Sequence, residues 1–214
     1  MVSHPDPAAP PVLPELSPKA EVILAAATQV FLSSGYDGTS MDRVAAAAGV
    51  SKHTIYHHFA DKQGLFSALI ERLVLRRFYS AFGPEESAQA PPQVRLRHLA
   101  DVLLSLQASA DYIDFLRLLI AESKQFPELA QLYTEAVMRR GHDCFVNYVA
   151  THPDLHFADP PAIAHIFFGA LIAYILSQEV LQAKQVIPLE AAILRDTLVT
   201  MIVAYGQGEA ALPQ

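Results

Sequence analysis

Apolar residues recur at intervals of three and four along most of the chain, which is the spacing of an amphipathic α-helix. The stretch after Pro18 shows this spacing clearly, with apolar side chains at Ile23, Ala26, Ala27, Val30 and Phe31. No stretch alternates apolar and polar residues convincingly over the length of a strand. The pattern predicts an all-α chain built from helical bundles.

Capping residues and helix breakers place the first four helices. Ser17 followed by Pro18 predicts a helix start, and Gly35 predicts its end. Thr39-Ser40-Met41-Asp42 matches a Thr-x-x-Asp capping pattern, and Ser51 and Asp61 are the expected caps of the next two helices. The expected helices are Met41 to Ala48, Lys52 to Phe59 and residues 61–80.

Prolines divide the rest of the chain. Breaks at Gly83-Pro84 and Pro91-Pro92 predict a domain boundary, and the proline-rich residues 1–17 predict a solvated, mostly disordered tail. Later helices are expected over about 93–109, 111–125, 128–151, 161–183 and 189–207. The prediction is therefore a tail at 1–17, an N-terminal three-helix helix-turn-helix domain at 18–82 and a larger C-terminal helical domain at 91–208.

Composition and charge narrow the classes of protein. Of the 214 residues, 52% are hydrophobic and 17% charged, which excludes a disordered chain. The net charge of −7 argues against nucleic-acid binding, but it is unevenly distributed. Residues 1–82 hold seven basic and seven acidic side chains, whereas residues 83–214 hold eight and fifteen. The N-terminal part is thus free to approach a polyanion, and the C-terminal part is not expected to.

The chain is expected to be cytoplasmic. Its first residues lack the basic start and apolar run of a signal peptide. The uncharged stretch between Asp159 and Glu179 has the ~20 residues of a membrane span, but it opens with two prolines, contains His165 and has no flanking basic cluster. A helix that is apolar nearly all round is also typical of a buried helix, so no membrane partner is expected.

The most informative stretch is residues 40–59, SMDRVAAAAGVSKHTIYHHF. Its first helix has a small apolar face that allows close approach of a second helix, and Gly49 supplies a tight turn. Ile55 and Phe59 lie four residues apart and give the second helix a buried face. Two short helices joined by a glycine-containing turn form a helix-turn-helix, whose second helix enters the DNA major groove.

Residues 35–66, GYDGTSMDRVAAAAGVSKHTIYHHFADKQGLF, resemble the N-terminal domain of TetR-family transcriptional regulators. Residues 115–135, FLRLLIAESKQFPELAQLYTE, resemble the C-terminal domain of the AefR-like subgroup of that family. His53 stands where the family often has a small residue, which bears on base preference.

The resemblance implies roles for residues of the helix-turn-helix. Side chains similar to family residues that bind phosphate oxygens are Thr39, Ser40, Ser51 and Tyr56, and Lys62 is similar to a phosphate-anchoring lysine. The expected contacts to base edges are made by Lys52, His53, Thr54 and His57. A lysine donates to guanine O6 and N7, and a threonine methyl suits thymine.

Aromatic and polar residues share helices in the C-terminal half. Core packing explains any one of them, but together some are expected to line an apolar cavity with a few polar groups. The resemblance implies a small, often hydrophobic effector there. The expected ligand-binding residues are Phe115, Tyr133, His142, Phe145, Phe168 and Gln178.

Two apolar helices predict a homodimer. The helix at 161–183 has more apolar surface than one partner face covers, and the last helix carries an apolar stripe. The expected interface residues are Ile172, Leu176, Leu194, Leu198, Met201 and Tyr205. A two-fold dimer would read a pseudo-palindromic operator in double-stranded DNA.

Other functions fit the sequence less well. Cys144 beside Asp143 resembles a nucleophile only superficially, and no convergent catalytic motif accompanies it, so the protein is not expected to be an enzyme or to need a cofactor. His53 and His57 have the spacing of a metal clamp but lack a third ligand, so no metal is expected. A helical scaffold or adaptor without DNA binding explains the bundles but not residues 40–59. The sequence favours a ligand-responsive regulator, a repressor released from its operator by a small hydrophobic effector.

Overall fold

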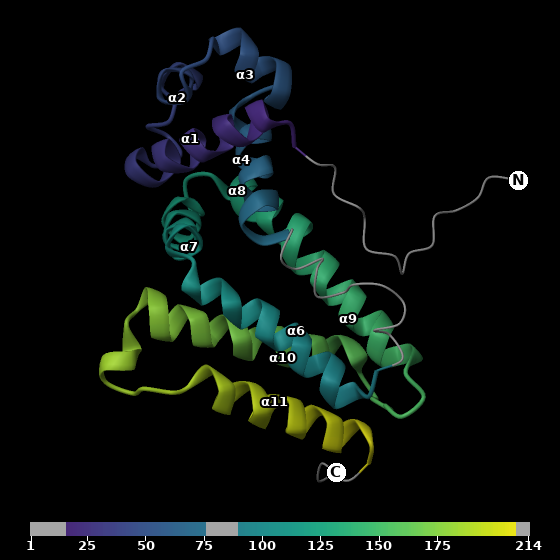
Figure 1. Cartoon of the computed structure of the whole chain (residues 1–214). Coiled ribbons are helices and arrows are strands. Elements are labelled where there is room, and N and C mark those ends of the chain that lie inside the picture. Colours follow the sequence, from purple (N-terminus) through teal and green to yellow (C-terminus); the bar gives the residue numbers. More distant parts are fainter. Residues whose placement is uncertain (1–15, 76–89, 209–214) are drawn as a thin grey trace, which may run out of the picture. The chain divides into compact units, whose positions relative to one another are not determined.

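The structure is a computed structural model that describes residues 16–75 and 90–208, and all regular elements in those ranges are helical (Figure 1). The all-α prediction is therefore confirmed. The described residues form two compact units. Residues 16–75 and 106–138 make up the first unit, and residues 90–105 and 139–208 make up the second unit.

The first unit combines the N-terminal helices with two helices from the middle of the chain. Its elements are α1 (Pro18–Ser34), α2 (Met41–Ala48), α3 (Lys52–Phe59), α4 (Lys62–Ile70), the π-helical turn η1 (Glu71–Leu75), the 3₁₀ turn η3 (Leu106–Ala108), α7 (Ala110–Glu122) and α8 (Pro127–Tyr133). Helix α7 contacts α1, and α8 contacts α4. The helices at 106–138, predicted within the 91–208 domain, thus pack with the N-terminal bundle, while the expected boundary at Gly83-Pro84 lies outside the described residues.

Local capping explains where the N-terminal helices begin. The side chain of Ser17 accepts a hydrogen bond from the Ala20 amide at 3.2 Å, and Asp61 Oδ1 accepts one from Gly64 at 2.7 Å. The expected cap at Thr39 is wrong, because Ser40 begins α2 by accepting from the Arg43 amide. The Thr39 hydroxyl instead donates to the Gly35 carbonyl at 2.7 Å, which fixes the preceding turn.

Aromatic rings form the centre of the first unit. Phe31, Phe66 and Phe115 are fully buried. The ring centroids of Phe31 and Phe66 lie 5.4 Å apart, and those of Phe66 and Phe115 lie 5.5 Å apart. Because Phe115 is on α7 and Phe66 on α4, these contacts join the middle of the chain to the N-terminal helices.

The second unit is built around an apolar helix. Its elements are α6 (Pro92–Ser105), α9 (Arg140–Thr151, which follows the π-helical turn η4, Thr134–Arg139), α10 (Pro160–Ile175), η5 (Leu176–Val180), η6 (Ala183–Gln185) and α11 (Ala191–Gly206). Helix α10 contacts α6, α9 and α11. Phe145 and Phe167 are buried between α9 and α10, with ring centroids 4.9 Å apart.

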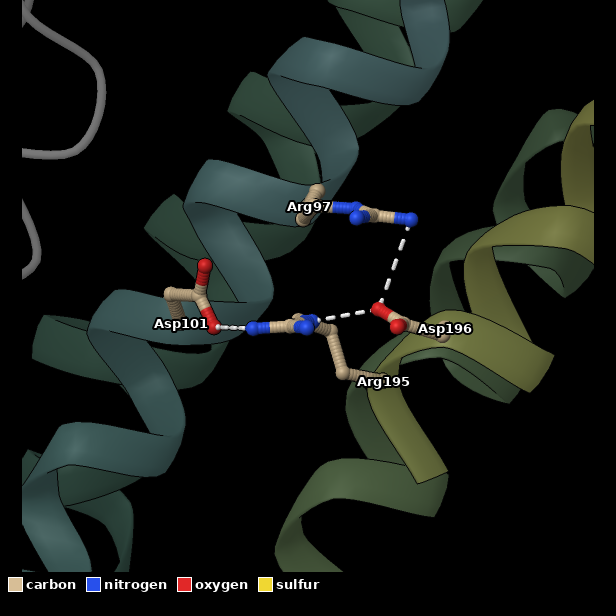
Figure 2. Close-up of polar contacts among 4 residues, drawn as sticks. All are labelled: Arg97, Asp101, Arg195 and Asp196. Carbon is tan, nitrogen blue, oxygen red and sulfur yellow. Dashed lines mark hydrogen bonds and ion pairs between the residues drawn. The ribbon is translucent and has the colours of Figure 1, made fainter. Parts of the chain in front are cut away.

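Charged side chains fasten α6 to α11 at the surface of the second unit (Figure 2). Arg195 on α11 binds Asp101 on α6 through Nη1 and its neighbour Asp196 through Nε, each at 2.6 Å. Arg97 Nη2 lies 3.4 Å from the same Asp196 carboxylate. The hydrogen bond from Arg195 holds the pKa of Asp196 below its ordinary value. This network links the helices, although exposed ion pairs contribute little each.

Residues Pro160–Val180 are, within the described parts of the chain, the one helical stretch long and apolar enough to cross a bilayer. Length and composition alone do not separate such a span from a core helix. Here α10 packs against three helices of its own unit, and Ile166 on it remains 56% exposed. The segment therefore combines a packed face with an apolar face that is open.

Candidate DNA-binding surface

The turn between α2 and α3 has the geometry of a helix-turn-helix. Gly49 ends α2 in the left-handed conformation, with φ 64° and ψ 33°, which favours glycine. Ser51 then caps α3 by accepting from the Thr54 amide at 3.1 Å. Ile55 and Phe59 are buried, so α3 turns its opposite face outward.

The outward face of α3 carries most of the side chains expected to read bases. Lys52, His53 and His57 are exposed, and Tyr56 is 43% exposed. Thr54 is half-buried, and its hydroxyl lies 2.8 Å from that of Ser51. Four predicted contact residues thus share one accessible surface, with Thr54 at its edge.

Lys52 is held by a neighbouring carboxylate. Its Nζ lies 2.8 Å from Asp42 Oδ2 on α2, and this hydrogen bond raises the pKa of Lys52. Both side chains are exposed, so water screens the pair. A base contact by Lys52 therefore requires only the exchange of a weak surface partner.

Four of the five residues expected to bind phosphate lie at or next to the start of a helix, whereas Tyr56 lies within α3. Ser40 and Ser51 are exposed N-caps of α2 and α3, where helix termini favour anions. Thr39 is only 3% exposed, and its hydroxyl is engaged with Gly35. Lys62, the first residue of α4, lies half-buried with its Nζ 4.2 Å from the centre of the Tyr36 ring.

Two groups of residues near this surface were missed by sequence reasoning. Arg43 is exposed on α2, and its guanidinium donates to the Gly38 carbonyl at 2.7 Å. Its charge within the motif was a usable signal. Glu122 and Phe126 contact Tyr36 from α7 and the start of α8, and no local pattern indicates a contact across that separation.

The predicted effector-binding residues are divided between the two units. Phe115 and Tyr133 are buried in the first unit, with ring centroids 6.2 Å apart. Phe145 packs on Phe168 in the second unit. His142 Nε2 lies 3.2 Å from the Pro161 carbonyl oxygen, and the buried Gln178 donates to the Ile187 carbonyl at 3.2 Å.

Two hollows open on the second unit. One of about 420 Å³ is lined by Tyr174, Gln178, Leu189 and Ile193, among others. The other, of about 500 Å³, is lined by Val149, Leu155, His156 and Phe157 among others. Both volumes fall in the range of small-molecule sites, and Gln178 is the one predicted effector residue that lines either hollow.

The predicted interface residues differ in accessibility. Met201 is 65% exposed, whereas Leu198 is 7% exposed and covered by its own chain. The remaining four are partly exposed: Ile172, Leu176, Leu194 and Tyr205. Ile193, which belongs to the predicted apolar stripe of α11, and Ile166 on α10 are more than half exposed.

Two observations among the described residues bear on the metal and nucleophile hypotheses. No group of three or more His, Cys, Asp or Glu side chains suited to a metal occurs among residues 16–75 and 90–208. Burial raises the pKa of Cys144, and Asp143 raises it further, so the thiol is not activated as a nucleophile.

Two family models match the chain. One, described as bacterial regulatory proteins of the tetR family, matches residues 23–69. The other, described as the AefR-like transcriptional repressor C-terminal domain, matches residues 94–207. Together they span both the helix-turn-helix and the helices that follow.

Curated relatives share parts of the chain. The repressor AcnR of Corynebacterium efficiens is 29% identical over 116 residues, which are 53% of this chain and 55% of that protein. The regulator RutR of Escherichia coli is 30% identical over 113 residues, 50% of this chain and 49% of RutR. The activator FasR of Mycolicibacterium smegmatis is 44% identical over 52 residues, 24% of each chain. The chain thus spans about half or less of the length of these relatives.

Solved structures match over most of the chain. A TetR-family regulator from Mesorhizobium loti is 27% identical with a TM-score of 0.64, over 87% of this chain and 96% of that one. The flavonoid-responsive regulator FrrA is 29% identical with a TM-score of 0.66, over 87% and 95%. Because a family model matches more than half of the chain, this protein belongs to the TetR family of bacterial transcriptional regulators and carries an AefR-like C-terminal domain.

Proposed function

We propose that this protein is a dimeric, ligand-responsive repressor that acts in the cytoplasm and leaves a pseudo-palindromic operator when a small apolar effector binds. The observation that carries the proposal is the accessible face of α3, where Lys52, His53, Tyr56 and His57 lie beyond a firmly packed helix-turn-helix. In this proposal Ser40, Ser51, Tyr56 and Lys62 bind phosphates, Thr39 fixes the turn before α2, and Lys52, His53, Thr54 and His57 read bases.

Open apolar surface supports the dimer. Ile166 on α10 and Ile193 and Met201 on α11 are each more than half exposed within one chain. Side chains of this kind, repeated on two helices, suit an isologous seam with a second copy. In a two-fold dimer the two copies of α3 would lie about one helical turn of DNA apart, roughly 34–36 Å or a multiple.

Aromatic and aliphatic lining supports an apolar effector. The hollow beside Gln178 combines Tyr174, Leu189 and Ile193 with a few polar groups. The similar protein FrrA is described as flavonoid-responsive, which is consistent with a flat aromatic ligand carrying polar substituents. By linkage, an effector that weakens operator binding 5–150-fold, roughly the usual range, must itself bind that much more weakly to the DNA complex.

Substitutions on the DNA face test the proposal. Lys62→Ala should weaken binding to all duplexes alike and flatten the salt dependence, because it removes a phosphate contact. Lys52→Ala should cost ~1–3 kcal/mol on an operator selected from random duplexes and relax its sequence preference. Fluorescence anisotropy across a salt series measures both effects. Normal binding by both folded variants would show that the assigned face is wrong.

The dimer has its own test. Met201→Arg places a charge on the proposed seam without touching the core of the protomer, and it should yield monomers in sedimentation velocity. Val22→Arg, which changes an exposed apolar residue of the first unit, is the matched control and should leave the oligomer intact. If the Met201 variant remains a dimer, the interface does not include this part of α11.

A further inference from the structure

Lys62 occupies an unfavourable position for a cation. It is the first residue of α4, where the helix dipole disfavours positive charge, and burial lowers the pKa of its ammonium group. Two contacts hold it there. Its Nζ lies 4.2 Å from the centre of the Tyr36 ring and 3.4 Å from the Asp37 carbonyl oxygen. The location of this charge therefore depends on where Tyr36 lies.

Phe126 helps to hold the Tyr36 ring. Tyr36 is 8% exposed, and its ring lies 5.8 Å from that of Phe31 and 5.5 Å from that of Phe66. Phe126, directly before α8, approaches more closely, with ring centroids 5.1 Å apart. Three rings thus restrict the tyrosine, and one of them comes from the middle of the chain.

Glu122 holds the backbone of the same tyrosine. Glu122 is the last residue of α7, and its Oε1 accepts a hydrogen bond from the Tyr36 amide at 2.9 Å. Gly35 makes room for this contact, because a Cβ at that position would lie 2.7 Å from Oε1. Gly35 also has φ 72°, which disfavours any larger residue. The two contacts from 122 and 126 therefore converge on one residue of the α1–α2 turn.

We propose that Glu122 and Phe126 are positioning residues for DNA binding: acting through Tyr36, they place the Lys62 ammonium where it meets a phosphate. This inference rests on the proposed phosphate contact of Lys62. Both residues lie within the stretch that the AefR-like C-terminal model matches, whereas Tyr36 and Lys62 lie in the stretch matched by the N-terminal model. The DNA anchor is thus completed by residues from the middle of the chain, within the first unit.

A pair of substitutions at Glu122 separates positioning from simple charge. Glu122→Gln keeps an oxygen that accepts from the Tyr36 amide but removes the negative charge near Lys62, so affinity for a random-sequence duplex should stay equal or rise. Glu122→Ala removes both the charge and the acceptor, so affinity should fall roughly twofold or more. Asp114→Ala, a carboxylate on α7 that pairs with Arg117, is the control and should not weaken binding.

A double-mutant cycle supplies the decisive readout. The losses from Glu122→Ala and Phe126→Leu should vanish in a Lys62→Ala background but persist in a Lys52→Ala background. Circular dichroism melts establish which variants are folded at the assay temperature. If Glu122→Ala does not fold, Phe126→Leu still tests the proposal, because leucine keeps an apolar side chain at that position. Equal affinities for the Gln and Ala variants, or losses that persist without Lys62, would overturn the inference. If Lys62→Ala itself changes neither affinity nor salt slope, the proposed phosphate anchor fails with it.

Discussion

The two units use aromatic side chains in different ways. In the first unit, ring contacts run without a gap from Tyr36 through Phe31, Phe66 and Phe115 to Tyr133. In the second unit, rings gather in a local cluster of Phe145, Phe167 and Phe168. The first unit therefore has a continuous aromatic core, and this core includes α4, which contacts α3.

The two units also differ in how much apolar surface they expose. Most large apolar side chains exposed among the described residues belong to the second unit, including Ile166, Leu181, Val186, Ile187, Ile193 and Met201. A monomer gains nothing by exposing so many neighbouring apolar groups. One unit is therefore completed by its own chain, whereas the other has surface that suits a partner.

The largest effect is expected from cutting the ring contacts of the first unit. Phe115→Ala removes a fully buried ring and should cost ~3–5 kcal/mol of unfolding free energy. Because Phe115 packs on Phe66, amides of α1 and α4 should lose hydrogen-exchange protection although the substitution is on α7. Phe167→Ala, an equal truncation in the second unit, should affect α9 and α10 instead. Loss of protection in the same amides for both variants would show that the two units do not unfold separately.

A smaller loss is expected at the α1–α2 turn. A Cβ at Gly38 would lie 2.3 Å from the Ser34 carbonyl oxygen. This oxygen belongs to the backbone, so it cannot move aside as the end of a flexible side chain can. Gly38→Ala should therefore cost ~2–3 kcal/mol in denaturant unfolding and should weaken DNA binding with it. Gly49→Asn is the control, since its Cβ would meet nothing within 4 Å and asparagine tolerates the left-handed conformation. Equal stability of the Gly38 variant and the native chain would contradict the observed turn.

These turns also show what the sequence was able to predict. The caps at Ser17, Ser51 and Asp61 were correct because capping depends on residues two or three positions apart. The sequence pattern assigns Thr39 to the following helix, but its hydroxyl donates to the Gly35 carbonyl in the preceding turn. A sequence pattern cannot tell which of the neighbouring hydroxyls at 39 and 40 caps the helix, because that depends on the path of the backbone.

Contacts distant in sequence were beyond such reasoning. Glu122 and Tyr36 are 86 positions apart, and each looks ordinary in its own helix or turn. The burial of Leu198 beside the exposed Met201 was equally hidden, because α11 is apolar on more than one face. The residues proposed to read DNA are recognisable from a short motif, whereas the residues that support their helix come from tertiary packing.

The stability of the two units should depend differently on pH in the alkaline range. Burial raises the pKa of Tyr112, and also that of Tyr133, whose hydroxyl lies 3.4 Å from that of Tyr112 in the first unit. Above the ordinary value of 10, the unfolded chain loses these protons and the folded chain keeps them, so stability is full below pH 10 and falls as pH rises. The expected fall is ~1.4 kcal/mol per pH unit for each tyrosine.

Substitution to phenylalanine measures each contribution. Tyr112→Phe should make the unfolding free energy fall less steeply above pH 10, by the slope that corresponds to one proton. Burial raises the pKa of Tyr148 in the second unit to about 12, so Tyr148→Phe should change the slope only between pH 10 and about 12. Denaturant titrations across this range test both. An unchanged slope in Tyr112→Phe would mean that this phenol ionises as easily in the folded chain as in the unfolded one.

The smallest effect is expected at Gly169, and it should have the opposite sign. Gly169 lies exposed in the middle of α10, and a Cβ there would meet nothing within 4 Å of its own chain. Because glycine in a helix interior is less favourable than alanine, Gly169→Ala should stabilise the subunit by ~0.5–1 kcal/mol in denaturant unfolding. Ile166, one turn away, belongs to the surface proposed to meet a second copy. If Gly169 makes a close contact there, the gain should appear in dilute protein and shrink or reverse as concentration favours the dimer. A concentration series therefore separates the two roles of this residue. A loss of stability even in dilute protein would contradict the open surface of the second unit on which the comparison rests.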